Sequence, residues 1–427
     1  MSNYNIGILV IIYSQNLKNY KTIRIISYKF KLTWCRGTLK LNSLNNEKTR
    51  LPASFFEITD ELIDKIKNGY FTDVYFLRAL NIINRVKKEN KDYRPRFLMN
   101  IFSRHKKGKA VVCGLDYSIR LIQSVSSGEV EINALYDGDI IGPNETVMTL
   151  AGHLEDFITL ETVYLGIIAR ATKVATRSWE VVEASLEKKI PILFFPARFD
   201  LFSNQSLDGY AGHISGVLGV STEAQSKWWG GKPLGTIPHA IIAYFKPGEF
   251  EGRWKDSTVE ATKWFARLHP NVNCISLVDF ENNCPETSLK VATALEDEGL
   301  NLWGVRLDTS SSLIDFSIIE NGQLDAFDKT GVNPTLVCNV RDILDDHGFT
   351  RDKVKIVVSG GFDADKIRYY AENNVPIDAI GVGSSLFKGN IDFTADIVAY
   401  EKNNEWISCG KVGRPYPKDL TRLERVV

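Results

Sequence analysis

Several side chains that could do chemistry follow short apolar runs in the second half of the chain, and His239 is the most informative of them. It closes the segment Gly235-Thr236-Ile237-Pro238-His239, directly after the run Pro233 to Thr236, which predicts a strand. Open α/β sheets and α/β barrels bind ligands at the carboxyl ends of their strands. A histidine in that position could become phosphorylated, although most histidines in a folded chain are surface or core residues without a chemical role.

Two glycine-containing loops later in the chain predict a phosphate site. They are Ser359-Gly360-Gly361 and Gly381-Val382-Gly383-Ser384, and each lies at the end of an apolar run. Glycine lets loop amides approach an anion closely, and a helix that begins after the loop adds a favourable dipole. Each loop alone could equally be a tight turn, but the two together, after successive strands, favour phosphate binding.

Charged and aromatic residues follow the other runs. Arg306 and Asp308 stand two residues apart, so in a strand their side chains point the same way. They could hold ribose hydroxyls and a phosphate oxygen, or they could form a structural ion pair. Phe195 could stack on a flat substrate while Arg198 pairs with a carboxylate, and the alternative for Phe195 is a place in the core. The remaining candidates are Ser221, Thr222 and Asp279.

The elements that position these residues alternate between apolar strands and helices after residue 190. Such alternation implies a parallel sheet that is covered on both faces. Seven runs within about 190 residues fit an irregular α/β barrel of the TIM type better than an open sheet. The runs are Ile192 to Phe195, Gly216 to Val220, Pro233 to Thr236, Cys274 to Asp279, Leu302 to Leu307, Val354 to Val358 and Ala379 to Val382.

An α+β domain is predicted before the barrel. Helical periodicity covers residues 57–92 with a break at Asn68-Gly69, and a long helical region spans 154–184. Strand-like runs lie between them, at 110–115, 129–135 and 146–150. The resulting division is 51–185 for this domain with its linking helix, 186–394 for the barrel with the active site, and 395–427 for a segment that packs back on the first domain.

Residues 1–50 differ from the rest of the chain, with nine Lys or Arg residues against the single acid Glu47. Their apolar run from Ile6 to Tyr13 is too short to span a bilayer, and it lacks the features of a signal peptide. We expect a basic extension that is disordered or absent from the native protein; a small β-structured segment is the other reading.

The composition excludes several partners. The 427 residues carry 52 basic and 52 acidic side chains, so no net charge directs the chain to nucleic acid or to a membrane. The six cysteines form neither a CxxC pair nor a Cys/His cluster, which suits a reducing compartment and predicts a cytoplasmic protein.

Several motifs in order make residues 53 to 420 similar to the nicotinate phosphoribosyltransferase family. The motifs are Thr72-Asp73-Val74-Tyr75, Leu160-Glu161-Thr162, Ala175-Thr176-Arg177, Phe195-Pro196-Ala197-Arg198, Gly219-Val220-Ser221-Thr222, Gly235-Thr236-Ile237-Pro238-His239-Ala240, Arg306-Leu307-Asp308-Thr309, and the two glycine loops. The resemblance implies a type II phosphoribosyltransferase architecture and a homodimer in which each active site borrows residues from its neighbour. It also implies a reaction of nicotinate with 5-phosphoribosyl 1-pyrophosphate that gives nicotinate mononucleotide and pyrophosphate in NAD biosynthesis.

The resemblance implies a role for each candidate. ATP hydrolysis would be coupled through phosphorylation of His239, with Mg²⁺ as the metal and Asp279 near the ribose or the metal. Nicotinate would meet Arg198 at its carboxylate and lie between Phe195 and Tyr75 of the partner subunit. The other nicotinate-site residues would be Ser221 and Thr222, and those of the phosphoribosyl site would be Arg306, Asp308, Thr309, Ser359, Gly360, Gly361, Gly381, Gly383 and Ser384.

The sequence departs from the family pattern at two places, and three alternative functions remain open. Thr309-Ser310-Ser311-Ser312 stands where many members have Ser-Gly-Asp, as in the shorter archaeal-type branch, and Phe195-Pro196 replaces the commoner Phe-Gly. A decarboxylating quinolinate phosphoribosyltransferase shares the architecture but would need a more basic pocket and has no use for His239. A nicotinamide-using enzyme would need an acidic group near the ring amide, and a non-catalytic nucleotide-binding homologue is the third rival.

Overall fold

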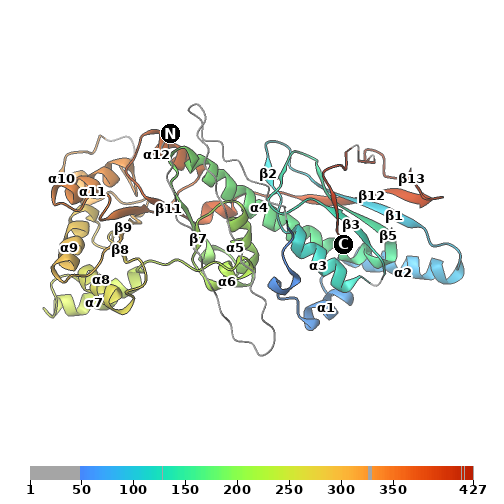
Figure 1. Ribbon diagram of the computed structural model, residues 1–427, viewed down its shortest axis with the longest axis horizontal. Helices are drawn as coiled ribbons and strands as arrows, with labels where there is room; N and C mark the ends of the chain where they lie inside the picture. Colours follow the sequence, from blue (N-terminus) through green and yellow to red (C-terminus); the bar gives the residue numbers. More distant parts are fainter. Residues whose placement is uncertain (1–48, 127, 326–328, 415, 418, 427) are drawn as a thin grey trace, which may run out of the picture. The chain divides into compact units, whose positions relative to one another are not determined.

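The computed structural model describes residues 49–426 apart from 127, 326–328, 415 and 418. The prediction for residues 1–50 therefore falls almost wholly outside the described residues. Two six-stranded sheets organise the described chain, one in each of the two regions that the sequence distinguishes (Figure 1). Within the described residues, no helix combines the length and the apolar character that crossing a membrane requires.

The first sheet is antiparallel and takes strands from both ends of the chain, in the order β13-β12-β1-β5-β3-β14. The central strands β1 and β5 are buried on both faces, so most of their residues are apolar and the sequence shows little alternation between apolar and polar residues. Its strands are β1 (Arg96–Ser103), β3 (Glu131–Ala134), β5 (Thr146–His153), β12 (Phe393–Lys402), β13 (Glu405–Ser408) and β14 (Glu424–Val426). The same region contains a separate two-stranded sheet of β2 (Ala110–Val111) and β4 (Ile140–Ile141) and the helices α1 (Asp60–Lys67), α2 (Val74–Glu89) and α3 (Leu115–Val125).

The second sheet is parallel, in the order β7-β6-β11-β10-β9-β8, and its strands alternate with helices along the chain. The elements are β6 (Ile192–Phe194), α5 (Gln205–Ile214), β7 (Gly219–Val220), α6 (Glu223–Ser226), α7 (His239–Phe250), α8 (Ser257–Leu268), β8 (Ile275–Leu277), α9 (Cys284–Asp297), β9 (Gly304–Leu307), α10 (Phe316–Glu320), α11 (Pro334–Asp346), β10 (Lys355–Val358), α12 (Ala364–Glu372) and β11 (Ala379–Val382). An irregular α/β barrel beside an α+β domain that C-terminal strands complete was predicted, and this fold class is confirmed.

The long helix α4 (Glu161–Ser185) joins the two hydrophobic cores. Its first half contributes Tyr164 and Ile168 to the core beneath the antiparallel sheet. Its second half contributes Val174 and Val181 to the core between the barrel strands and their helices. One helix therefore contributes side chains to both cores (Figure 1).

Several helices of the barrel begin at side-chain caps in the loop that precedes them. Asp256 caps α8 by accepting hydrogen bonds from the backbone N–H groups of Thr258 and Val259. Asn283 and Asn333 cap α9 and α11 in the same way, each followed by a proline in the first turn. These caps fix where each loop ends, and with it the position of the residues that the loop carries.

The predicted strand at Pro233 to Thr236 is wrong, because these residues form only a single bridge. Pro233 pairs with Val220 of β7, and the Leu234 N–H donates to the carbonyl of Val220 at 2.7 Å. At the other end the Ile237 N–H reaches the carbonyl of Ile275 in β8. Pro233 and Pro238 have no N–H to donate, so a regular ladder cannot form. An irregular segment thus links the two edge strands of the curled sheet.

Two elements of the first domain were not predicted correctly. Strand β1 was missed, and the strand-like run at 110–115 ends at Val111, because helix α3 begins at Leu115. The start of α3 depends on a distant residue: Asp137 accepts the Leu115 N–H at 2.8 Å. Because this cap comes from a residue far away in the sequence, the residues around Leu115 do not indicate that a helix begins there.

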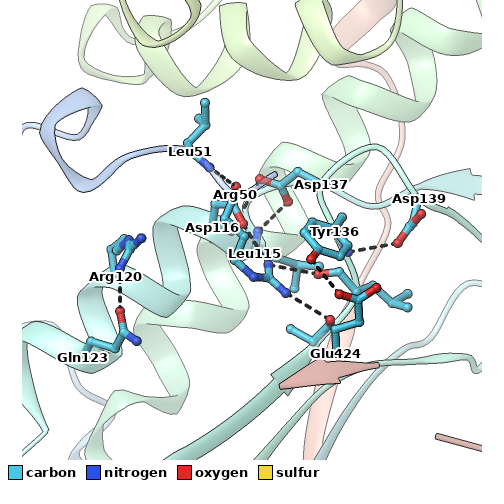
Figure 2. Close-up of polar contacts among 12 residues, drawn as sticks. Arg50, Leu51, Leu115, Asp116, Arg120, Gln123, Tyr136, Asp137, Asp139 and Glu424 are labelled. Carbon is cyan, nitrogen blue, oxygen red and sulfur yellow. Dashed lines mark hydrogen bonds and ion pairs between the residues drawn. The ribbon is translucent and has the colours of Figure 1, made fainter. Parts of the chain in front are cut away.

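The described chain begins in a polar cluster beside α3 (Figure 2). Arg50 pairs with Asp116 at 2.9 Å and donates to the carbonyl of Ala134, and the Leu51 N–H donates to the same carboxylate. Asp137 lies next to Asp116. Burial and the neighbouring Asp116 carboxylate together raise the pKa of Asp137 to about 8.

Candidate active site

A cavity of about 540 Å³ opens at the carboxyl ends of the parallel strands. This volume falls within the range of small-molecule sites. Residues from the loops after β6, β7, β9, β10 and β11 and from the segment before α7 line it: Phe195, Ala197, Arg198, Phe199, Ser221, Leu234, Gly235, Thr236, Pro238, His239, Ala240, Leu277, Arg306, Asp308, Ser359, Gly360, Gly361, Phe362, Gly381, Gly383 and Ser384. The structure therefore brings together most of the residues that the sequence singles out.

Arg306 is held in the cavity wall by three oxygen acceptors from three segments. Its guanidinium donates to the hydroxyl of Ser359 at 2.9 Å, to the hydroxyl of Thr236 at 2.9 Å, and to the carboxylate of Asp308 at 3.1 Å. The same carboxylate accepts a hydrogen bond from Ser359 at 2.7 Å. Arg306 and Asp308 thus form an ion pair within the cavity, where both side chains remain about one fifth exposed.

His239 is the first residue of α7, and its ring contacts a nearly buried carboxylate. The Nε2 atom lies 3.0 and 3.2 Å from the two oxygens of Asp279, whose side chain is 8% exposed. This hydrogen bond, helped by the negative charges of Asp279 and Asp308, raises the pKa of His239. The N-terminus of a helix also favours a negatively charged group such as a phosphate.

Aromatic rings form the wall next to the last strand. The ring of Phe195 lies against Gly381, since a Cβ atom at that glycine would approach the ring to 2.5 Å. The ring also packs on the buried cluster of Leu193, Ile275, Val357 and Ala379, and the guanidinium of Arg306 lies 5.4 Å from its centre. Arg198 is exposed and contacts only the ring of Phe199 among the described residues, so its guanidinium is available to a ligand.

The first glycine loop has the backbone shape of an anion site. Gly360 and Gly361 have φ values of 89° and 71°, which residues with a side chain rarely adopt. Their N–H groups have no acceptor among the residues that the structure describes. The Ser359 hydroxyl, in contrast, is already used by Arg306, Asp308 and the carbonyl of Leu307. Backbone donors, and not this hydroxyl, are therefore free for an anion.

Four predicted residues do not line the cavity of their own chain. Tyr75 lies near the start of α2 and is 60% exposed. Thr222 caps α6 and donates to Gln205 at 2.8 Å. Thr309 is buried at 3% exposure beside Cys284. Asp279 also lies outside the lining but reaches it through His239.

The site contains one polar residue for which no role was predicted. Thr236 stands within the motif that includes His239, yet nothing in its type or spacing indicated a partner. The partner is Arg306, 70 residues later in the chain. The only available signal was its place among residues that follow apolar runs.

A magnesium ion held by several protein side chains is not supported among the described residues, where no three His, Cys, Asp or Glu side chains gather as a metal site. Magnesium often binds through one or two carboxylates together with substrate phosphates. Asp279 and Asp308 stand at the same mouth and fit that pattern, although His239 and Arg306 already contact them.

Comparisons with known proteins agree with this geometry. Residues 73–172 match the family described as quinolinate phosphoribosyl transferase, N-terminal domain. A nicotinate phosphoribosyltransferase of Mycobacterium tuberculosis is 26% identical over 298 residues, which cover 68% of this chain and 57% of that protein. The match thus spans little more than half the length of this curated relative.

Solved structures extend the likeness to the whole fold. The crystal structure of nicotinate-nucleotide pyrophosphorylase from Pyrococcus furiosus has a TM-score of 0.66 at 29% identity, and the match covers 84% of this chain and 81% of that one. The human nicotinic acid phosphoribosyltransferase has a TM-score of 0.58 at 15% identity, with 77% and 75% covered, which supports the fold alone. The predicted resemblance of this chain to the nicotinate phosphoribosyltransferases is therefore confirmed.

Proposed function

We propose that this protein is a nicotinate phosphoribosyltransferase that serves NAD salvage. The observation that carries the proposal is a single cavity with an uncommitted guanidinium, Arg198, an ion pair, Arg306 with Asp308, and a glycine loop with free N–H donors. A nicotinate carboxylate suits Arg198, because Arg306 is already bound to three oxygens. The loop at Gly360 and Gly361 suits the 5-phosphate of the second substrate.

The proposed transfer needs position and charge more than proton transfer. As pyrophosphate leaves C1 of the sugar, positive charge develops there, and the pyridine nitrogen forms the new bond to C1. Asp308 supplies negative charge beside the sugar, while Arg306 and the glycine loop hold the phosphoribosyl group. Asp279 and Asp308 would hold Mg²⁺, which would supply positive charge to the leaving pyrophosphate.

ATP would act through His239. With the Nε2 proton donated to Asp279, the lone pair that attacks the γ-phosphorus is on Nδ1, and ADP leaves as the bond to the β-phosphate oxygen breaks. The phosphohistidine, at the N-terminus of α7, then changes the affinity of the cavity for substrates and products. His239→Ala should lose acid-labile phosphorylation and ATP coupling while weak nicotinate transfer persists. The surface variant His347→Ala is the matched control, and undiminished phosphorylation of His239→Ala contradicts the assignment.

We also propose a homodimer with shared sites. Tyr75 lies outside the cavity of its own chain and stands beside exposed apolar residues at the α1–α2 corner: Tyr70, Phe71 and Val74. Mixing Tyr75→Ala with Arg306→Ala subunits should restore activity, since hybrid dimers contain one intact site. A mixture as inactive as each variant alone would contradict the shared site.

One assay tests the activity itself. Purified protein is incubated with 5-phosphoribosyl 1-pyrophosphate, Mg²⁺ and either nicotinate, nicotinamide or quinolinate, with and without ATP. We expect product from nicotinate and a stimulation by ATP.

The second candidate is a decarboxylating quinolinate phosphoribosyltransferase, which the matched N-terminal family and the Pyrococcus furiosus relative favour. Against it, Arg198 is the only arginine or lysine in the cavity lining that is not already paired. The two carboxylates of quinolinate would require more than one unpaired basic side chain. Product from quinolinate alone, with release of carbon dioxide, would replace our proposal with this one.

A further inference from the structure

Thr236 belongs to the irregular segment that links the two edge strands of the barrel, and its hydroxyl is turned toward the cavity. Its Oγ1 atom accepts a hydrogen bond from the Nη1 of Arg306 at 2.9 Å. The next residue, Ile237, is fully buried in a cluster with Ile242 and Leu277. Burial of Ile237 fixes the segment, and with it the direction of the Thr236 side chain.

The irregular backbone has a consequence for Arg306. In a regular strand at this place, successive side chains would alternate between the barrel interior and the surrounding helices. The segment instead makes one bridge to β7 and one hydrogen bond to β8, so Thr236 takes its direction from Ile237 and from Arg306. The missing ladder thereby allows a side chain from outside the sheet to contact β9.

Thr236 holds the one part of the Arg306 guanidinium that the neighbouring strands do not. Ser359, after β10, accepts from Nε, and Asp308, directly after β9, accepts from Nη2. Among the residues that the structure describes, only Thr236 accepts from Nη1. Without Thr236 the Nε and Nη2 edge of the guanidinium would keep Ser359 and Asp308, whereas Nη1 on the opposite edge would lose its acceptor and the orientation of the group would be less tightly held.

We propose that Thr236 is a positioning residue, which orients Arg306 for the phosphoribosyl group. This inference rests on the proposed function. Removing one hydrogen bond to a charged group commonly weakens binding by about tenfold or more. Since the Arg306 side chain is 19% exposed, water replaces part of the loss. We expect about a tenfold effect.

The test compares Thr236→Val, which keeps the shape and removes the acceptor, with Thr236→Ser, which keeps the acceptor. Thr236→Val should raise the KM for 5-phosphoribosyl 1-pyrophosphate about tenfold and leave the KM for nicotinate and the melting temperature unchanged. Thr236→Ser should stay close to the unaltered protein. A change in both KM values, or no rescue by serine, would overturn the positioning role. Should Thr236→Val not fold, Thr236→Ala takes its place in the same comparison.

A double-mutant cycle asks whether Thr236 acts through Arg306. Binding of 5-phosphoribosyl 1-pyrophosphate is measured by calorimetry, without turnover, in Thr236→Val, Arg306→Ala and the double variant. The valine substitution should weaken binding in the unaltered background and have no further effect once Arg306 is absent. Additive losses would overturn the inference. Failure of the proposed nicotinate activity would appear separately, as binding without transfer.

Discussion

Gly381 tests whether the position of the Phe195 ring determines nicotinate binding. A Cβ atom at Gly381 would lie 2.5 Å from Cδ2 and 2.6 Å from Cε2 of Phe195. Ordinary contacts begin near 3.4 Å, so Gly381→Ala requires a displacement of about 0.9 Å (3.4 minus 2.5). The backbone of β11 is paired on both sides, with β6 and β10, so the ring must move. Overpacking of this kind typically costs about 1–3 kcal/mol.

Displacement of the Phe195 ring should weaken the binding of nicotinate. We expect Gly381→Ala to raise the KM for nicotinate by about tenfold or more, since about 1.4 kcal/mol of lost binding corresponds to tenfold. The matched control is Gly235→Ala in the same cavity wall, where an added Cβ meets nothing within 4 Å. Steady-state kinetics and thermal unfolding are measured for both. An unchanged nicotinate KM in Gly381→Ala, or an equal loss in Gly235→Ala, would refute the reasoning.

Three further predictions follow from charges in the structure. Asp279→Asn should lower the pH at which His239 becomes phosphorylated by ATP, because Asp279 raises the pKa of the His239 imidazole and only the neutral imidazole attacks. The pH midpoint of phosphate incorporation measures this, and an unchanged midpoint would contradict the prediction. Arg198→Gln should weaken nicotinate binding by about 10- to 100-fold, because a charge-assisted bond to the carboxylate is lost. Binding of nicotinamide, which has no carboxylate, should not weaken. Competition assays measure both affinities, and an equal loss for the two compounds would contradict the prediction. Asp137, with a pKa of about 8 in the folded state, keeps a proton that the unfolded chain releases near its ordinary value, so the free energy of unfolding should fall between about pH 4 and pH 8. Urea unfolding of Asp137→Asn should lack that fall, and a persisting slope would show that other groups cause it.

The sequence predicted the parallel strands well because each is a short, buried apolar run. Six of the seven runs contain strands at or within their predicted limits. The seventh, at Pro233 to Thr236, had the right apolar character and the wrong conformation, since its prolines withhold N–H donors. An apolar run indicates that a segment is buried, but it does not show whether the segment is a strand or an irregular linker. Only the number of backbone N–H donors could have distinguished the two.

The first domain was harder to predict because its signals are not local. Strand β1 is buried on both faces, so its sequence shows no alternation that distinguishes it from a buried helix. Helix α3 starts where Asp137, more than 20 residues away, accepts its first N–H.

The candidate site was predictable as a set of loops but not as a set of contacts. Spacing could place Arg306 and Asp308 on one side of a strand. It could not show that Thr236 and Ser359 complete the arrangement, since those bonds join residues 70 and 53 positions apart.

The strand order of the antiparallel sheet has a consequence for synthesis of the protein. The three strands made first, β1, β5 and β3, are flanked on both sides by strands from the far end of the chain, β12 and β14. Ser103 of β1 pairs with Phe393, which is made 290 residues later, or roughly 15–60 s at about 5–20 residues per second. Throughout that interval the nascent sheet has two open edges, which are sites of aggregation. Until β12 and β14 have been synthesised, the first domain therefore cannot complete its sheet, and both edges stay exposed to pairing with other chains.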